Sequence, residues 1–100
     1  MASQFGDRIR ALRTEQKLLL RQVASKLDVD TSIISKIERG ERQIKKEQIP
    51  ILAEMLKADK DELLTLWLAD QLYEVVKDEK FATEAMQAAE KKIKHQKSKK

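Results

Sequence analysis

A short segment in the first half of the chain carries polar side chains whose types and spacing suit contact with DNA bases. Four of them repeat at intervals that place them on one side of a helix: Thr31, Ser32, Ser35 and Lys36. Hydroxyl and ammonium groups in a row on a protruding helix can reach base edges in the DNA major groove. Ile33 lies among them, and its spacing allows either a place in the core or contact with a thymine methyl group.

Apolar residues before and within this segment predict two short helices that meet at a tight corner. Val23, Ala24 and Leu27 fall three and four residues apart, and the same spacing resumes at Ile34 after a break at residues 28–30. The small side chain of Ala24 allows the two helices to cross at close range. The second helix is therefore expected to keep its polar side outward.

The second helix carries signals for both of its ends. Asp30 can cap the first turn through its carboxylate, and Gly40 can end the helix in the left-handed conformation. We therefore predict a helix from Thr31 to about Arg39.

Basic residues gather in and after the turn at Gly40. This cluster consists of Arg39, Arg42, Lys45 and Lys46. A charge cluster of this kind can be a solvated loop, but beside a base-reading helix it favours contacts with DNA phosphates.

Several motifs between Phe5 and about Leu68 resemble the lambda-repressor-like, Cro and xenobiotic-response-element type helix-turn-helix domains. The motifs agree with those domains in order and spacing: RIRALR at residues 8–13, VASKL at 23–27, ISKIERGER at 34–42 and DELL at 61–64. The resemblance implies an all-α protein whose compact five-helix lambda-repressor-like domain binds double-stranded DNA.

The resemblance assigns a structural role to one arginine. Arg13 stands where these domains have an arginine that pairs with a glutamate at the end of the recognition helix, and that glutamate is Glu38 here. Such an ion pair would brace the recognition helix against the first helix. If the pair is buried, removing one partner costs about 3 to 5 kcal/mol. For Arg8 and Arg10 we expect solvated surface.

The sequence departs from the family at the start of its second helix and at the corner. Leu19 replaces the usual Ser or Thr cap, and Leu20 replaces a Gln that often contacts a phosphate. Arg21 and Gln22 are near enough to contact a phosphate instead. Asp28 stands where these domains commonly have Gly, and Asp tolerates the left-handed conformation better than most residues.

The remaining helices are predicted from caps and apolar spacing. Ser3 can cap a helix over residues 4–15, and a helix that begins near residue 46 can hold Pro50 in its first turn. Asp59 and Glu62 form a capping-box pattern before the next helix. A last helix is expected to turn five apolar side chains inward: Phe81, Ala85, Met86, Ala89 and Ile93.

The charges divide the chain into unlike parts. Residues 1–46 carry 11 Lys and Arg against 6 Asp and Glu, residues 47–90 carry 4 against 11, and residues 91–100 carry 6 Lys and no acid. A basic half that holds the helix-turn-helix suits a module with one side facing polyphosphate. We divide the chain into a DNA-binding domain (1–70), a C-terminal helical extension (71–93) and a disordered basic tail (94–100).

The helix that follows Asp59 has more apolar side chains than one stripe needs. It is apolar at every position but one from 63 to 68, so we expect it to bury a second face. We predict a two-fold interface that includes Leu66 and Tyr73, seven residues apart, with Trp67 at its edge. The alternative is that the C-terminal helix covers this face within one chain.

Composition limits other kinds of chemistry. The absence of Cys leaves no disulfide, thiolate metal site or cysteine nucleophile, and the single His, His95, lies among lysines and is better interpreted as a solvated side chain than as a metal ligand. The sequence has no glycine-rich phosphate loop and no nucleophile beside a base. We therefore expect no enzyme activity, no cofactor and no small-molecule effector. With neither a signal peptide nor an apolar run of about 18 residues, we expect a cytoplasmic protein without a membrane partner.

These observations favour a transcriptional regulator, either a repressor or a controller, that reads an inverted repeat as a homodimer through residues 31–39. Its half-sites would lie about one helical turn of DNA apart. The small size is similar to that of controllers of restriction and modification genes, an analogy that rests on the fold alone. The alternative is a protein-interaction module or antitoxin of the same fold whose main partner is a protein.

Overall fold

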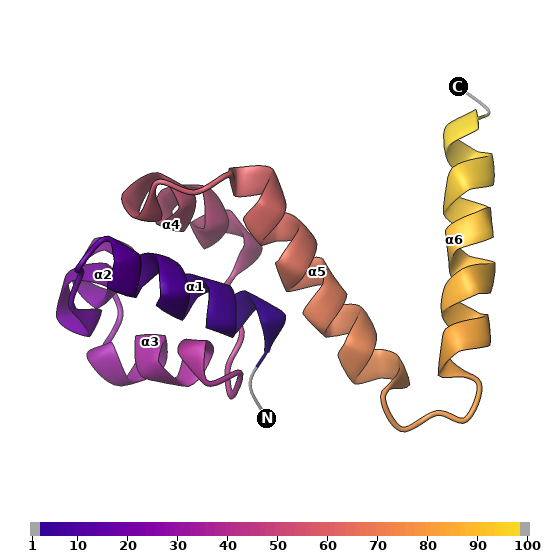
Figure 1. Cartoon of the computed structure of the whole chain (residues 1–100), viewed down its shortest axis with the longest axis horizontal. Coiled ribbons are helices and arrows are strands. Elements are labelled where there is room, and N and C mark those ends of the chain that lie inside the picture. Colours follow the sequence, from indigo (N-terminus) through magenta and orange to yellow (C-terminus); the bar gives the residue numbers. More distant parts are fainter. Residues whose placement is uncertain (1–2, 99–100) are drawn as a thin grey trace. The chain divides into compact units, whose positions relative to one another are not determined.

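The computed structural model describes residues 3–98, which form helices joined by short turns (Figure 1). In chain order these are α1 (Gln4–Glu15), α2 (Leu20–Leu27), α3 (Thr31–Glu38), the 3-10 turn η1 (Lys46–Gln48), α4 (Ile49–Leu56), α5 (Lys60–Val76) and α6 (Ala82–Ser98). Residues 3–98 contain no β-strand, so the predicted all-α class is confirmed. The chain divides into two compact units, residues 1–70 and 71–100.

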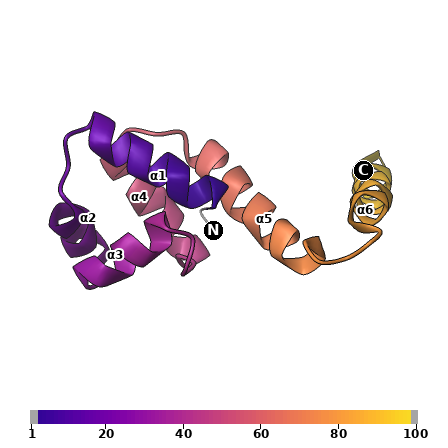
Figure 2. The same ribbon diagram turned by 60° about the horizontal axis from the view of Figure 1, so that its bottom comes forward.

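The first unit is built around one hydrophobic core. Every helix from α1 to α5 turns an apolar face into this core, and the largest fully buried side chains are Ile9, Val23, Ile34, Ile49, Leu52, Leu56 and Leu63. Helix α3 packs against α2 and α1, and α4 packs against α2 and α1 (Figure 2). Because α3 is supported by two helices, its remaining side is free to face outward.

A side-chain cap marks the start of α1, and a proline marks the start of α4. The Ser3 hydroxyl accepts a hydrogen bond from the Gly6 N–H at 2.8 Å, and α1 has the predicted bounds. Pro50 lies in the first turn of α4, where its missing N–H costs no intrahelical bond. The predicted helix start near residue 46 is a 3-10 turn that leads into α4.

Four helix ends close with a residue whose φ is positive: Lys17, Asp28, Gly40 and Lys57. At the corner between α2 and α3, Asp28 has φ 57°, and the Val29 N–H donates to the Ala24 carbonyl at 3.0 Å. This arrangement satisfies a carbonyl that would otherwise lack a partner at the helix end. Since three of these four residues have a β-carbon, their helix ends carry a steric cost that glycine would avoid.

Asp28→Gly is expected to raise the free energy of unfolding by about 0.4 to 1 kcal/mol, because relief of the left-handed strain exceeds the entropy gained by the unfolded chain. Urea denaturation of the two proteins measures the difference. Gly40→Ala, at φ 77°, is the reverse control and should destabilise. A lower stability for Asp28→Gly would show that the carboxylate contributes more than the strain costs.

Two predicted caps are wrong in their details. Asp30 has the extended backbone of a capping residue, but its side chain makes no cap hydrogen bond, so its carboxylate leaves the first turn of α3 uncapped. Asp59 does cap α5, accepting from the Asp61 N–H at 3.0 Å. Glu62 instead pairs with Arg8 at 3.0 Å. Arg8 is therefore not the plain solvated residue that we expected, although a half-exposed pair of this kind contributes little stability.

The second unit corrects two predictions about the C-terminal residues. The apolar side chains of α6 were expected to face inward, but Phe81, Met86 and Ile93 are all exposed, because within residues 3–98 the rest of the chain leaves most of that face uncovered. Helix α6 also continues to Ser98, whereas we predicted a disordered tail from residue 94. Lys and Gln are good helix formers, and lysines near a helix C-terminus offset its dipole. The rest of the predicted tail, residues 99–100, lies outside the described residues.

Candidate nucleic-acid interface

The corner between α2 and α3 places α3 against the core with little space between the helices. Ala24 is 3% exposed and lies in the core with Val23, Ile34 and Ile37. A small side chain at this position permits the close packing of α2 and α3 that the sequence predicted.

The outward side of α3 carries the residues that we predicted to read bases. Thr31, Ser32 and Lys36 are exposed, whereas Ser35 and Ile33 are partly buried. Ile33 packs against the hydrophobic core, which covers part of its side chain. Only the part that remains exposed can contact a thymine methyl group. Three freely accessible hydrogen-bonding side chains therefore share this face of α3.

An ion pair with a buried carboxylate holds the C-terminal end of α3 to α1. Arg13 Nε lies 2.6 Å from Glu38 Oε2, and Arg13 Nη2 lies 3.1 Å from Glu38 Oε1. Glu38 is 7% exposed and is the buried charged residue of the core. Arg13 Nη1 also donates to the Leu18 carbonyl at 2.9 Å. The pair that the resemblance implied is thus present, with both carboxylate oxygens and the turn after α1 satisfied.

Helices α1 and α3 also approach each other closely at Gly6, a contact that sequence reasoning missed. A β-carbon at this position would lie 2.5 Å from the Ile37 carbonyl oxygen and 2.7 Å from the Glu38 carbonyl oxygen. No side chain fits at those distances, so only glycine lets the first turn of α1 approach the last turn of α3 this closely. The helical spacing around residue 6 contains no sign of the contact, because it depends on a segment 31 residues away.

Asp70 is a third contact that the sequence did not indicate. Its two carboxylate oxygens accept hydrogen bonds from the backbone N–H groups of Gln4 and Phe5, at 3.1 and 2.9 Å. These donors belong to the first turn of α1, where N–H groups lack intrahelical partners and negative charge is favoured. Helix α5 is thereby joined to the start of α1.

The two residues predicted to contact phosphate at the start of α2 differ in their surroundings. Arg21 is exposed. Gln22 is also exposed, but its side-chain oxygen accepts a hydrogen bond from the Leu19 N–H at 2.7 Å. Because Leu19 has no side-chain acceptor of its own, Gln22 supplies the cap at this helix start. The cap uses only the side-chain oxygen of Gln22, so its amide NH₂ can still donate to an anion.

Arg39 is engaged by neighbouring side chains. Its Nε lies 2.8 Å from Glu41 Oε2, and its Nη1 donates to the Ser35 hydroxyl. The hydrogen bond from Arg39 lowers the pKa of the Glu41 carboxyl, so the pair favours the ionised form of Glu41. A DNA phosphate that binds Arg39 must therefore share the guanidinium with a carboxylate or replace it.

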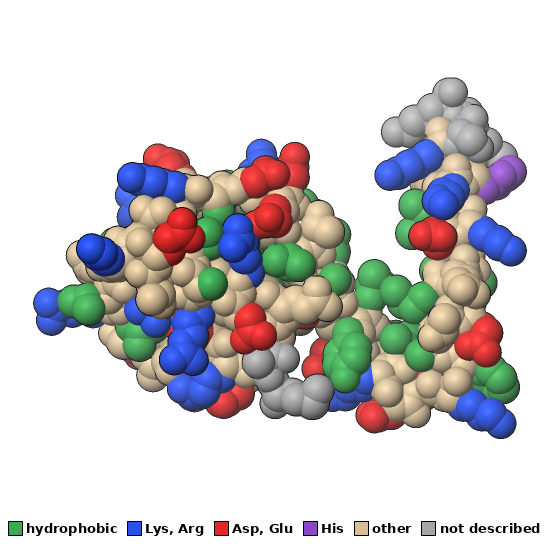
Figure 3. Space-filling view, in the orientation of Figure 1, with side chains coloured by type: hydrophobic (Ala, Val, Ile, Leu, Met, Phe, Trp, Pro, Cys, Tyr) green, Lys and Arg blue, Asp and Glu red, His purple; other side chains and the backbone are tan. Residues whose placement is uncertain are grey.

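The other cations of the basic cluster after α3 are available to an anion. Arg42, Lys45 and Lys46 are exposed. Figure 3 shows Lys and Arg side chains gathered over the lower left of the face it draws, where Figure 1 places α2 and α3. Phosphate contacts position a base-reading helix on DNA, and the exposed Arg21 on α2 adds a further cation.

The three residues predicted for a dimer interface differ in how much surface they offer. Leu66 and Trp67 pack against the core of the first unit. Trp67 Nε1 also donates to the Ile44 carbonyl at 2.8 Å. Tyr73, in the second unit, is 50% exposed. Of the three, Tyr73 therefore has the most surface left for a second copy of the chain.

A family model described as a helix-turn-helix domain matches residues 4–66. The chain belongs to the helix-turn-helix domain family. The matched segment contains α1 to α4 and the first part of α5, together with the Arg13–Glu38 pair and the exposed face of α3. Within residues 3–98 no group of acidic, His or Cys side chains could hold a metal ion, and no helix is both long and apolar enough to cross a bilayer.

Two known proteins are similar to this helix-turn-helix chain. The HTH-type transcriptional repressor RghR of Bacillus subtilis (strain 168) is 46% identical over 54 residues, which are 53% of this chain and 40% of the repressor. The chain therefore matches less than half the length of that relative. The crystal structure of the restriction-modification controller protein C.AhdI from Aeromonas hydrophila has a TM-score of 0.54 and 36% identity, over 59% of this chain and 89% of that one. The fold of the first unit is thus shared with a solved controller protein.

Proposed function

We propose that this protein binds double-stranded DNA in a sequence-specific manner and regulates transcription, with the outward face of α3 reading the bases. The observation that carries this proposal is a helix held rigidly on its inner side and left open on its outer side. Glu38 and the close approach at Gly6 fix the end of α3, while Thr31, Ser32 and Lys36 remain exposed. A short helix held in this way can enter the major groove.

The proposal assigns different work to the two kinds of polar residue. Base contacts come from the exposed side chains of α3, with a smaller share for Ser35 and Ile33. Phosphate contacts position the protein without reading sequence. They come from Arg21 and Gln22 on α2 and from the cluster after α3: Arg39, Arg42, Lys45 and Lys46.

The similarities to a transcriptional repressor and to a restriction-modification controller protein support a regulatory role. We further propose that the protein acts in the cytoplasm as a homodimer on an inverted repeat, since a two-fold protein reads two half-sites about one DNA turn apart. Tyr73, with the remaining exposed parts of Leu66 and Trp67, belongs to the surface through which two copies meet.

Selection of bound sites from a random DNA pool tests the proposed function directly. The expected result is enrichment of one motif with two inverted halves. Enrichment of a single half-site would overturn the dimer and keep the DNA-binding proposal. Recovery of unselected sequences at low salt, with no binding at physiological salt, would overturn specific recognition altogether.

Lys36→Ala is expected to weaken binding to the selected site by about 1 to 3 kcal/mol and to relax the preference at one base position, because an ammonium on α3 can donate to guanine O6 and N7. Fluorescence anisotropy with single-base variants of the site measures both effects. The matched control is Arg42→Ala, which should weaken all DNA alike and reduce the slope of log K against log salt by about 0.9. Equal losses on every base variant for Lys36→Ala would assign Lys36 to a phosphate instead.

A further inference from the structure

Helix α6 is unusual in this protein because its side chains are left uncovered. Every described side chain from Thr83 to Lys97 is exposed. Helices in proteins gain most of their stability from packing an apolar face and not from helix propensity alone. The 17 residues of α6 therefore need a partner surface.

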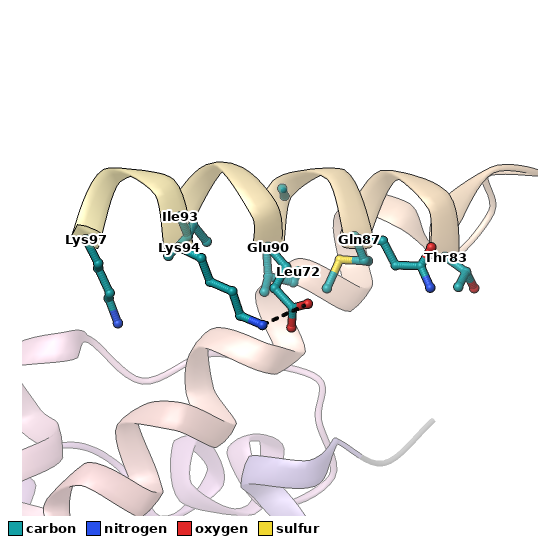
Figure 4. Close-up of a pocket in the computed structure, with 9 residues that line it drawn as sticks. Leu72, Thr83, Gln87, Glu90, Ile93, Lys94 and Lys97 are labelled. Atoms are coloured by element: carbon teal, nitrogen blue, oxygen red, sulfur yellow. Dashed lines mark ion pairs between the residues drawn. The ribbon is translucent and has the colours of Figure 1, made fainter. Parts of the chain in front are cut away.

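One side of α6 has the character of such a packing face. Ala82, Met86, Ala89 and Ile93 are spaced by four, three and four residues and form one stripe along the helix. Within the second unit, this side of α6 and Leu72 from the end of α5 line an open groove of about 490 Å³ (Figure 4). Leu72 is itself half-exposed, so the apolar surface continues beyond the helix.

The charges of α6 indicate what covers the stripe. Its first nine residues, 82–90, contain two Glu and no Lys or Arg, whereas residues 91–98 contain four Lys and no acid. Two copies of α6 packed antiparallel keep the lysine-rich ends of the two helices apart. A parallel pair would instead place the lysines of both copies together. Antiparallel packing also aligns the helix dipoles favourably.

The sizes of the side chains point to the same arrangement. The midpoint of the stripe lies between residues 87 and 88. When two stripes are aligned antiparallel about this midpoint, Ile93 lies opposite Ala82, and Met86 lies opposite Ala89. Each large side chain then meets a small one, which allows the helices to interdigitate. In a parallel pair with equal register, large side chains would meet large ones and alanines would face each other across a gap.

We propose that α6 packs antiparallel against α6 of a second copy of this chain, so that the second unit is a dimerisation element. This inference rests on the homodimer in the proposed function and names the segment that holds it together. The end of α5, with Leu72 and Tyr73, extends the same interface. The two copies bury the stripe that each chain leaves exposed by itself.

Two neighbouring alanines provide a matched test in the full-length protein. Ala89 lies in the stripe, whereas Ala88 points about 100° away around the helix, and both are exposed in the single chain. Ala89→Glu is expected to raise the dimer dissociation constant about tenfold or more, because a carboxylate would be buried without a partner. Ala88→Glu makes the same change in charge and helix propensity and should leave the dissociation constant within about twofold. Sedimentation equilibrium measures both constants.

Cross-linking tests the direction of the two helices. The natural sequence has no Cys, so Ala82→Cys and Gln96→Cys can be prepared as separate proteins, mixed and joined with a short bismaleimide. In the antiparallel pair residue 82 of one copy lies within about one helical turn of residue 96 of the other, whereas two copies of residue 82 are about 16 Å apart along the axis. Peptide mass spectrometry should therefore find mainly 82-to-96 links between chains. Mainly 82-to-82 and 96-to-96 links would overturn the antiparallel arrangement.

The outcomes separate this inference from the proposed function. If Ala89→Glu and Ala88→Glu both remain dimers and bind the selected DNA, the homodimer stands and its assignment to α6 is overturned. If the unmodified protein is a monomer at about 100 μM and on DNA, the homodimer itself fails, and the stripe belongs to another occupant. If Ala89→Glu alone becomes monomeric while the circular dichroism of both variants is unchanged, the inference is supported.

Discussion

Arg13→Ala is expected to lower the free energy of unfolding by about 3 to 5 kcal/mol. The substitution strands the carboxylate of Glu38, whose side chain is 6% exposed, and it also removes the hydrogen bond to the Leu18 carbonyl. A buried charge without a partner costs far more than the pair contributes when intact. Chemical denaturation monitored by the fluorescence of Trp67 measures the change.

Two controls show whether the stranded charge is the cause. Arg10→Ala changes an exposed arginine of the same helix and should alter stability by less than about 0.5 kcal/mol. The double variant Arg13→Met, Glu38→Met removes both charges and should be less destabilised than Arg13→Ala alone. A double variant as unstable as the single one would attribute the loss to packing or to the Leu18 contact.

The second large effect is expected for Gly6→Ala, which should destabilise the protein by about 1 to 3 kcal/mol. The added β-carbon would come within 2.5 and 2.7 Å of the Ile37 and Glu38 carbonyl oxygens, and backbone atoms cannot move aside as the end of a long side chain can. Helices α1 and α3 must separate to make room. Urea denaturation measures the loss, and the same shift of α3 should weaken binding to the selected DNA.

The sign of the Gly6 effect is itself informative. In an unconstrained helix interior, replacement of Gly by Ala stabilises by roughly 0.5 to 1 kcal/mol. A net loss therefore requires a steric cost larger than this gain. If Gly6→Ala raises the free energy of unfolding, the close approach of α1 to α3 is not a constraint on the fold.

Features encoded by neighbouring residues could be predicted from the sequence. The bounds of α1 follow from Ser3 and the apolar spacing after it, and the end of α3 follows from Gly40, because caps and helical faces involve residues only a few positions apart. The Arg13–Glu38 pair spans 25 residues. It was accessible through the resemblance to a family and not through local spacing.

Features that depend on distant residues could not be predicted in this way. Asp70 meets the start of α1 across 66 residues, and Trp67 meets the Ile44 carbonyl across 23. Neither contact leaves a periodic signal. The partners of long polar side chains are also hard to predict from the sequence. Gln22 and Arg39 can each reach several hydrogen-bonding groups, and the three-dimensional geometry decides which of them is bound. For α6 the pattern revealed an apolar face but not whether its own chain covers it.

The pairing of Arg39 with Glu41 bears on how the protein would find its operator. A phosphate that approaches Arg39 meets the ionised carboxylate of Glu41 beside it, which opposes binding on random DNA and at the operator alike. At the operator we expect base contacts along α3 to offset this repulsion. We therefore expect Glu41 to shorten the stops on random DNA and at the operator by a similar factor, with base contacts keeping the operator complex the longer-lived of the two. Shorter stops let one molecule sample more of a genome in a given time, so an acidic residue inside a basic cluster can accelerate target search while it lowers overall affinity for DNA.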